Sequence, residues 1–252
     1  IDEDSEGVRE WTPIGSVDCR YEGTFDGQGY VISGLYVNQP EEDNVGLFGY
    51  IGRGGIVKDV TIKNSYFRGK ERVGGICGNN FGGEIEGCIN GGKVVGDKKV
   101  GGICGRNYMV IEKCEIKGEI EGICDVGGIC GENHMVVKEC ENKGVVNGGS
   151  KCVGGICGIN FGEIKGSRNE GEVRGTGEDV GGICGFNEGE IKGSRNEGEV
   201  RGKERVGGIC GENGKEGRIE ESENKGLVEG TGEDVGGICG INFGEIKGSR
   251  NE

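Results

Sequence analysis

The sequence predicts an all-β fold, a right-handed parallel β-helix, and three observations predict it. The 252 residues include 60 Gly but no Ala and only three Leu. This composition disfavours helices, because Ala and Leu are the best helix formers and Gly is among the worst. Val and Ile together number 49, and β-branched side chains favour strands. The hexapeptide Val-Gly-Gly-Ile-Cys-Gly recurs seven times, and self-similarity at a fixed period of this size indicates a solenoid.

The hexapeptide sets the organisation of the chain. Its copies lie 26 to 29 residues apart and begin at Val73, Val100, Val126, Val153, Val180, Val206 and Val235, with a looser copy at Val45. Within one unit, three short segments (153–158, 163–165 and 172–175) are separated by turns rich in Gly and Asn. One unit of about 27 residues therefore fits one coil of three strands, stacked about 4.8 Å from the next coil. Crossovers between parallel strands are right-handed by default.

The first 44 residues lack the repeat, and we expect them to form an N-terminal cap and the first coil. They hold the only Trp, Trp11, and both prolines, and a solenoid needs an atypical unit to cover its open sheet end. The β-helix repeats then occupy 45–252. The last unit stops before the third strand of earlier copies, which suggests a fragment of a longer protein. If no further coils follow, the C-terminal edge is open and could pair with another chain. Self-association into fibres through coil ends is one alternative that follows.

Stacked coils convert recurring residues into columns. One Asn column follows the hexapeptide in all seven copies, at Asn80, Asn107, Asn133, Asn160, Asn187, Asn213 and Asn242. A second Asn column, interrupted only by Ile116, comprises Asn90, Asn142, Asn169, Asn196, Asn224 and Asn251. Asn tolerates left-handed turn geometry and can hydrogen-bond to the same amide one coil away, so we expect structural ladders. In support of this register, Arg218 and Glu220 reverse the Glu–Lys order found in the coils on either side.

The 13 cysteines allow three interpretations. Seven of them form one column in the hexapeptide, and Cys88, Cys114 and Cys140 form a second column that Ser167, Ser194, Ser222 and Ser249 continue. We favour buried free thiols acting as small apolar side chains. The alternatives are one or a few disulfides, for which Cys124–Cys152 is the first pair to test, and a metal or iron–sulfur site. The last is disfavoured because no Cys-x-x-Cys pair occurs.

The sequence does not decide which side chains of the hexapeptide point into the coil. If the hexapeptide is one strand, Ile and Cys point to opposite faces, and one of the two columns is exposed unless a bulge intervenes. We expect Ile to point inward, or both side chains to be partly covered.

Two sets of residues are candidates for binding. Rings follow the first Asn column in four consecutive coils, at Phe81, Tyr108, His134 and Phe161. They form either a stacking platform for a glycan or peptide or, as we favour, a corner ladder in which rings pack on one another. Acidic residues occupy the third turns, at Asp97, Asp125, Glu178–Asp179 and Glu233–Asp234. Calcium binding is one interpretation, but we favour solvated turn charges and expect no metal.

Several function classes are disfavoured. The net charge of −14 offers no basic stripe for nucleic acid, and no apolar run reaches the 18 residues of a membrane span. Catalytic sites break repeat symmetry by clustering ionisable groups, whereas the acids here recur at regular spacing. We therefore expect neither an enzyme nor a cofactor.

At this point the residues show a family resemblance. The segments Trp11-Thr-Pro-Ile-Gly15, Phe25-Asp-Gly-Gln-Gly-Tyr-Val-Ile-Ser-Gly-Leu35 and Val45-Gly-Leu-Phe-Gly49, together with the reiterated hexapeptide, resemble GLUG-repeat proteins. These are bacterial surface and secreted proteins, and the repeat also occurs in the non-catalytic part of IgA-protease-type metallopeptidases.

The resemblance implies an extracellular or cell-surface, non-enzymatic β-helical stalk or adhesin-like module, with a glycan or a host surface protein as its partner. It carries no catalytic residue onto this chain. The alternative is an accessory substrate-binding domain of a secreted peptidase or glycan-active enzyme.

Overall fold

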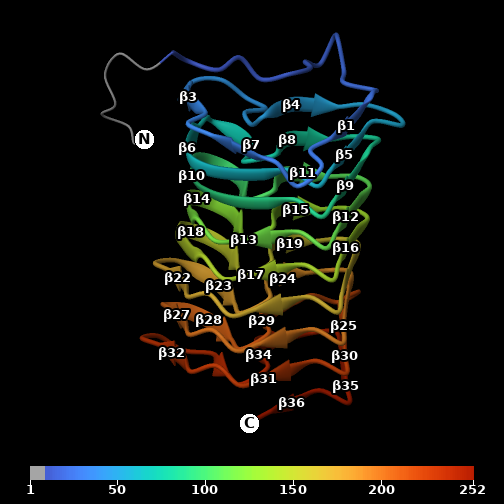
Figure 1. The fold of residues 1–252 in the computed structure, drawn as a ribbon. Helices are drawn as coiled ribbons and strands as arrows, with labels where there is room; N and C mark the ends of the chain where they lie inside the picture. The colour runs from blue at the N-terminus through green and yellow to red at the C-terminus, as the bar shows by residue number, and fades with distance from the viewer. Residues whose placement is uncertain (1–8) are drawn as a thin grey trace.

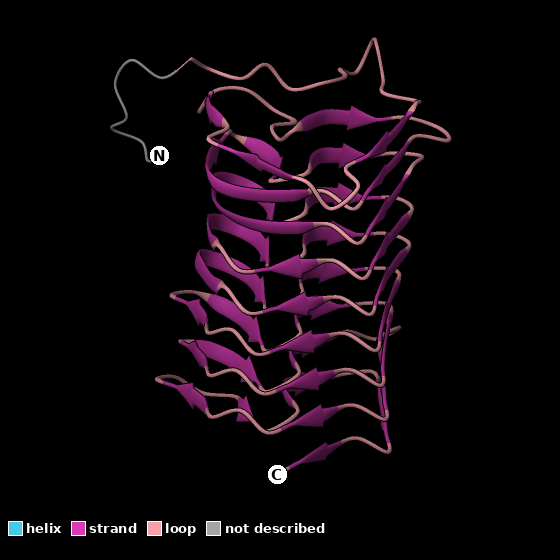
Figure 2. Cartoon of the chain, viewed as in Figure 1, coloured by secondary structure: helices cyan, strands magenta, loops and turns pink. Residues whose placement is uncertain are grey.

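The chain winds into a parallel β-solenoid, as the repeat predicts. In the computed structural model, which describes residues 9–252, consecutive coils stack from the N-terminal to the C-terminal end and no helix occurs (Figure 1). The strands of each coil pair in parallel with those of the next and form three sheets, here called A, B and C (Figure 2). The eight strands of sheet A count eight hexapeptide coils, the Val45 copy included.

Each coil contributes one short strand to sheet A, one to sheet B and one to three segments to sheet C. Sheet A comprises β4 (Phe48–Ile51), β8 (Cys77–Asn80), β11 (Cys104–Asn107), β15 (Cys130–Asn133), β19 (Cys157–Asn160), β24 (Cys184–Asn187), β29 (Cys210–Asn213) and β34 (Cys239–Asn242). Sheet B comprises β1 (Thr24–Asp26), β5 (Ile56–Lys58), β9 (Glu84–Glu86), β12 (Val110–Glu112), β16 (Val136–Lys138), β20 (Glu163–Lys165), β25 (Glu190–Lys192), β30 (Arg218–Glu220) and β35 (Glu245–Lys247).

Sheet C is the longest wall of the coil and contains the remaining strands. It comprises β2 (Val31–Ser33), β3 (Tyr36–Asn38), β6 (Thr61–Arg68), β7 (Glu71–Gly74), β10 (Ile89–Gly101), β13 (Glu115–Ile116), β14 (Glu119–Gly127), β17 (Glu141–Asn142), β18 (Val145–Gly154), β21 (Arg168–Asn169), β22 (Val173–Gly175), β23 (Glu178–Gly181), β26 (Arg195–Asn196), β27 (Val200–Gly202), β28 (Glu204–Gly207), β31 (Glu223–Asn224), β32 (Val228–Gly230), β33 (Val235–Gly236) and β36 (Arg250–Asn251).

The hexapeptide is not one strand, and this corrects the picture of alternating Ile and Cys. Val153 and Gly154 end β18 in sheet C, the chain bends at Gly155–Ile156, and Cys157 begins β19 in sheet A. Because a corner separates the two strands, alternation does not continue through it. Both Ile156 and Cys157 are fully buried, as are the equivalent pairs from Ile76–Cys77 to Ile209–Cys210.

Glycine at this corner permits an unusually close approach of two strands. A Cβ atom on Gly154 would lie 2.0 Å from the carbonyl oxygen of Cys157, and one on Gly158 would lie 2.5 Å from the carbonyl carbon of Asp125 in the preceding coil. Both distances are far inside van der Waals contact, so only glycine fits. The glycines of the hexapeptide therefore set the shape of the coil.

Asn ladders join the coils along two corners, as predicted. In the first column, the Asn107 Nδ2 donates to Asn133 Oδ1 at 2.9 Å, and the same bond continues through Asn160 and Asn187 at 2.8 Å. The second column has the same bond from Asn142 to Asn169. At the interruption by Ile116, the Asn90 Nδ2 donates instead to the carbonyl oxygen of Gly102.

The register predicted from charge reversal is also observed. Glu190 pairs with Arg218, which pairs in turn with Glu245. Glu220 lies between Lys192 and Lys247, and its carboxylate is 2.8 Å from the Lys192 Nζ. Each reversed side chain thus has an opposite charge on both neighbouring strands.

The N-terminal segment adds a first coil above the repeats. Phe25 of β1 pairs with Val57 of β5, and isolated bridges join Ile14 to Phe48 and Tyr21 to Ile51. Trp11 packs against the core, and its indole Nε1 donates to the carbonyl oxygen of Leu47 at 3.3 Å. The described part of the repeat-free segment, 9–44, therefore pairs with the first repeat coil; its role as a cap stays a prediction.

Most of the cysteines are buried, as the interpretation of free thiols acting as small apolar side chains expects. All 13 cysteines are free; Cys19 is exposed, Cys124 and Cys239 are half-buried, and the other ten are buried. In the second column, Cys140 Sγ accepts from the Cys114 N–H at 3.4 Å, and Ser167 Oγ accepts from the Cys140 N–H at 3.3 Å. Serine continues this column because it is small and offers the same acceptor.

Candidate functional site

The four predicted rings meet at the corner between sheets A and B. The Phe81 and Tyr108 centroids are 5.7 Å apart with an edge-on geometry. Tyr108 and His134 stack at 4.3 Å and 12°, and His134 and Phe161 stack at 5.2 Å and 25°. The faces of the central rings are thus occupied by one another, while Phe81 and Phe161 remain 48% and 46% exposed. Packing of ring on ring is what a corner ladder requires; ligand binding by these residues stays a prediction.

A cluster of charges holds the ladder at His134. The Glu132 Oε1 is 2.6 Å from His134 Nε2 and 3.0 Å from Arg106 Nε, and its Oε2 is 3.2 Å from Lys99 Nζ. Burial alone raises the pKa of Glu132, but the bond to His134 and the charges of Arg106 and Lys99 outweigh it, so the pKa of this carboxyl is lowered. Glu132 therefore acts as a fixed anion that orients the imidazole.

A second column lines the hexapeptide corner and was not anticipated. The residue before each hexapeptide Val adopts a left-handed backbone conformation, at Asn44, Arg72, Lys99, Asp125, Cys152, Asp179, Arg205 and Asp234. This geometry is uncommon outside Gly, Asn and Asp. The signal in the sequence was the recurrence of Asp and Asn directly before the Val.

Three of the acidic turn residues, Asp125, Asp179 and Asp234, belong to this column, and the burial of the first two corrects the expectation of solvated charges at those positions. Asp125 and Asp179 are only 7% and 3% exposed. Asp179 Oδ1 is 2.7 Å from Arg205 Nε, and Arg205 also pairs with Glu178 and Glu212. Burial raises the pKa of Asp125 and raises that of Asp179 to about 6, against the opposing charge of Arg205. The positive backbone φ turns these side chains into the corner instead of toward solvent.

Cys152 lies between these two acids in the column. Its Sγ is 3.9 Å from Asp179 Oδ2, and burial together with the charges of Asp179 and Asp125 raises the thiol pKa. A protonated thiol is a weak nucleophile. Cys124, the partner suggested from the sequence, is in register with Lys151 in the adjacent coil, one position before Cys152, and both cysteines are free. A disulfide between them stays a prediction.

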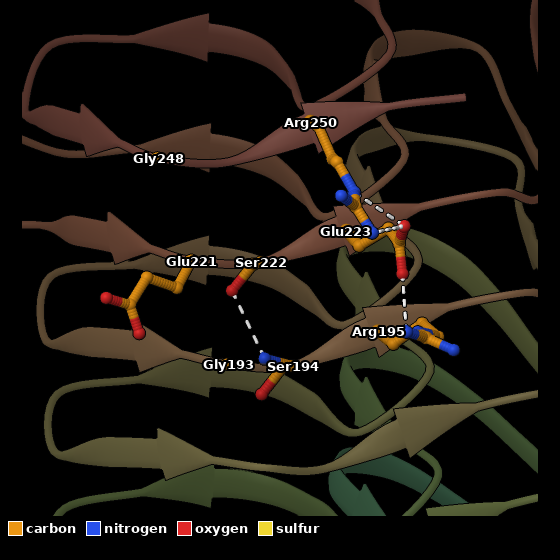
Figure 3. A pocket seen from close by; sticks show the side chains of 8 residues that line it. All are labelled: Gly193, Ser194, Arg195, Glu221, Ser222, Glu223, Gly248 and Arg250. Carbon is orange, nitrogen blue, oxygen red and sulfur yellow. Dashed lines mark hydrogen bonds and ion pairs between the residues drawn. The ribbon is translucent and has the colours of Figure 1, made fainter.

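A shallow recess of about 290 Å³ lies on the outer face of sheet C (Figure 3). Glu223 bridges its two arginines, with Oε2 2.7 Å from Arg195 Nη2 and Oε1 2.6 Å from Arg250 Nη2. The recess opens where Gly193 and Gly248 carry no side chain on either side of Glu221. The ion pairs of Glu223 with Arg195 and Arg250 connect three neighbouring coils and stabilise their stacking.

Two consecutive coils depart from the repeat beside the ring ladder, and sequence reasoning missed them. After the first Asn column, three coils read Phe161-Gly-Glu163, Glu188-Gly-Glu190 or Phe243-Gly-Glu245, one has an extra glycine (Phe81-Gly-Gly-Glu84), and one has a longer turn that ends at Arg218. The two coils beside the ladder instead read Tyr108-Met-Val110 and His134-Met-Val136. They hold both methionines of the chain. A comparison of units position by position would have found them.

Two further observations concern cofactors and membranes. Among residues 9–252, no three His, Cys, Asp or Glu side chains are grouped so as to hold a metal ion. The same residues contain no helix long and apolar enough to cross a lipid bilayer.

Comparisons with known proteins give partial matches. No protein-family model matches the chain. It is 37% identical over 75 residues to a protein of Evansella cellulosilytica named "Putative Gly-rich membrane protein", and 33% identical over 92 residues to Halomucin of Haloquadratum walsbyi. These matches cover 29% and 36% of this chain, and the chain spans only 9% and 1% of the two relatives.

A solved structure shares the fold. The crystal structure of "a putative immunoglobulin A1 protease" from Bacteroides ovatus superposes with a TM-score of 0.60, over 96% of this chain and 74% of that one. The sequences are 19% identical, so the likeness concerns the β-solenoid architecture. The chain is therefore a β-solenoid module whose partial relatives include a membrane protein and a halomucin.

Proposed function

We propose that the chain is a non-enzymatic, rod-like module of a bacterial surface or secreted protein, a stalk or adhesin-like segment outside the cell. The unbroken in-register stack carries this proposal. Six consecutive Asn–Asn bonds run from Asn80 to Asn242 at 2.8 to 2.9 Å and connect seven coils. Eight coils at about 4.8 Å give a rod of about 40 Å. A repeated coil in which each corner is hydrogen-bonded to the next provides length and stiffness.

The names of the two partial relatives support an outer location. One is called a membrane protein and the other a halomucin. The experiment is antibody labelling of intact cells of the source organism, with the same antibody on permeabilised cells as control. Labelling of intact cells, removed by external protease, is the expected result. Labelling only after permeabilisation would contradict the proposal.

An accessory substrate-binding domain is the second candidate, favoured by the exposed rings at the two ends of the ladder. A glycan array probed with the wild type and with a triple Ala variant of Phe81, Tyr108 and Phe161 tests it. Binding that the variant loses would establish the platform. Because the faces of Tyr108 and His134 are stacked on each other, the rod interpretation predicts no glycan binding.

A further inference from the structure

The two coils that break the repeat place apolar side chains on the outer face of sheet B. Val110 and Val136 occupy the position where β9 and β20 have Glu84 and Glu163. Met109 and Met135 precede them, and Met135 is 49% exposed. We call Met109, Val110, Met135 and Val136 the Met–Val patch. It lies beside the Tyr108–His134 stack, on the column of sheet B strands at the right of Figure 1.

The surroundings of the Met–Val patch are symmetric about the midpoint between β12 and β16. The outer column of sheet B reads Glu84, Val110, Val136, Glu163, and the ring column reads Phe81, Tyr108, His134, Phe161. Reversing the order of the coils leaves the Glu–Val column unchanged and exchanges only Tyr108 with His134 in the ring column. An apolar centre thus has matching residues on both sides.

The charges beside the patch are reversed by the same operation. The second outer column of sheet B reads Glu86, Glu112, Lys138, Lys165 in consecutive coils. Reversing the coil order therefore places acids opposite bases in this column, with Glu86 against Lys165 and Glu112 against Lys138.

We propose that the Met–Val patch is an interface with a second copy of this chain, packed antiparallel about a two-fold axis that lies between β12 and β16 and parallel to the strands. In such an isologous contact, each residue meets the position related to it by the two-fold. Val110 then faces Val136 of the second copy, and Glu112 faces Lys138 of the second copy. The two rods then run in opposite directions. Rods that extend toward each other from two opposite surfaces would overlap in this orientation.

The size of the patch sets the strength of the contact. Four coils at about 4.8 Å and four positions at about 3.3 Å outline roughly 250 Å², well below the about 800 Å² per partner of a standard stable interface. Glu84 also meets Glu163 of the second copy at the margin. The dimer is consequently expected among weak, transient contacts.

The chemistry of the patch favours a protein surface over a glycan. Met and Val offer flexible apolar contact but no hydrogen bonds. Glu112 and Lys138 are 2.7 Å apart within one chain and keep exposed side-chain area, 20% and 37%, with which they can meet their opposites in a second copy. Charge complementarity of this column with its own reverse selects a second copy as that protein.

Sedimentation velocity of the full chain from about 10 µM to about 1 mM, with reductant because Cys19 is exposed, measures the association. Val136→Glu is the first variant; it introduces the residue that Glu163 and Glu190 supply in later coils, where two acids pair in register. The wild type should dimerise weakly and Val136→Glu should stay monomeric. Association that Val136→Glu leaves unchanged comes from another surface and overturns the proposal.

A charge exchange separates the interface from effects on folding. Glu112→Lys alone and Lys138→Glu alone each place like charges opposite each other twice, and should weaken the dimer about tenfold. An equimolar mixture of the two variants restores both opposite-charge contacts and should associate like the wild type. A mixture that stays as weak as its components refutes the antiparallel register. A wild type that is monomeric at about 1 mM refutes self-association and leaves the patch to an unlike protein partner.

Discussion

Removing one rung of the Asn ladder should weaken the rod more than any exposed Asn substitution. Asn160 is fully buried. Its Nδ2 donates to Asn187 Oδ1, to the Gly162 carbonyl and to the Glu190 carbonyl, and its Oδ1 accepts from Asn133 Nδ2 and the Gly162 N–H. Asn160→Ala removes all five contacts.

The expected loss follows from what each partner retains. Asn133 Nδ2 keeps the carbonyl of Met135, and Asn187 Oδ1 keeps the Gly189 N–H. The Gly162 N–H, by contrast, loses its acceptor. Two ladder bonds at about 1 kcal/mol each and one orphaned donor at about 1–3 kcal/mol give a loss of about 3–5 kcal/mol.

Urea unfolding followed by far-UV circular dichroism under reducing conditions measures this loss. Asn147→Ala is the matched control, because Asn147 is half-buried and makes a single 3.3 Å bond to Glu119; it should cost less than about 0.5 kcal/mol. Hydrogen exchange in the three coils that contain Asn133, Asn160 and Asn187 shows whether opening is local, as one-dimensional repeat stacks allow. Equal losses in the two variants would refute the ladder as the main corner support.

Three further predictions follow from the same contacts. Arg218→Glu places an acid between Glu190 and Glu245, so that three acids stack in register, and should cost about 0.5–1 kcal/mol at low salt. About 0.5 M salt should largely abolish this loss; a loss independent of salt would contradict the charge argument. Burial raises the pKa of Asp179 to about 6, above its unfolded value of about 3.9. The folded state alone therefore takes up this proton as pH falls from about 6 to about 4, and wild type should gain up to about 3 kcal/mol over that window relative to Asp179→Asn; parallel pH profiles of the two proteins would refute it. Cys140→Ser should be neutral within about 0.5 kcal/mol, since Ser167 serves the next coil, whereas Cys140→Ala orphans the Cys114 N–H and should cost about 1–2 kcal/mol; equal urea midpoints for the two variants would show that size alone matters.

The stacking of the coils could be predicted from the period, because residues one period apart in the sequence lie on neighbouring strands when the coils stack in register. Asn107 lies on Asn133 because 26 residues make one coil. The same relation between period and position predicts that Arg218 lies between Glu190 and Glu245. Where one coil repeats the next, a one-dimensional pattern already contains the neighbours.

Only part of the candidate site could be predicted from the sequence. The ring ladder was identified at all four residues, and its internal stacking favours the corner interpretation. The burial of Asp125 and Asp179 was missed, because a regular acidic position resembles a solvated turn until the left-handed backbone shows where the side chain points. The Met–Val patch does not follow from the repeat, because it lies where two units differ from the others.

The fold class, the length of a coil, both Asn ladders and the register follow from the amino-acid sequence alone, since all four depend only on period and residue type. The cross-section of the coil, in contrast, is seen only in three dimensions. The bend at Gly155–Ile156 interrupts strand alternation, so Ile156 and Cys157 are both buried, and Gly154 and Gly158 bring two backbones into contact. The position of a corner depends on backbone angles that glycine permits but does not require. The residue pattern alone therefore does not predict where the chain bends.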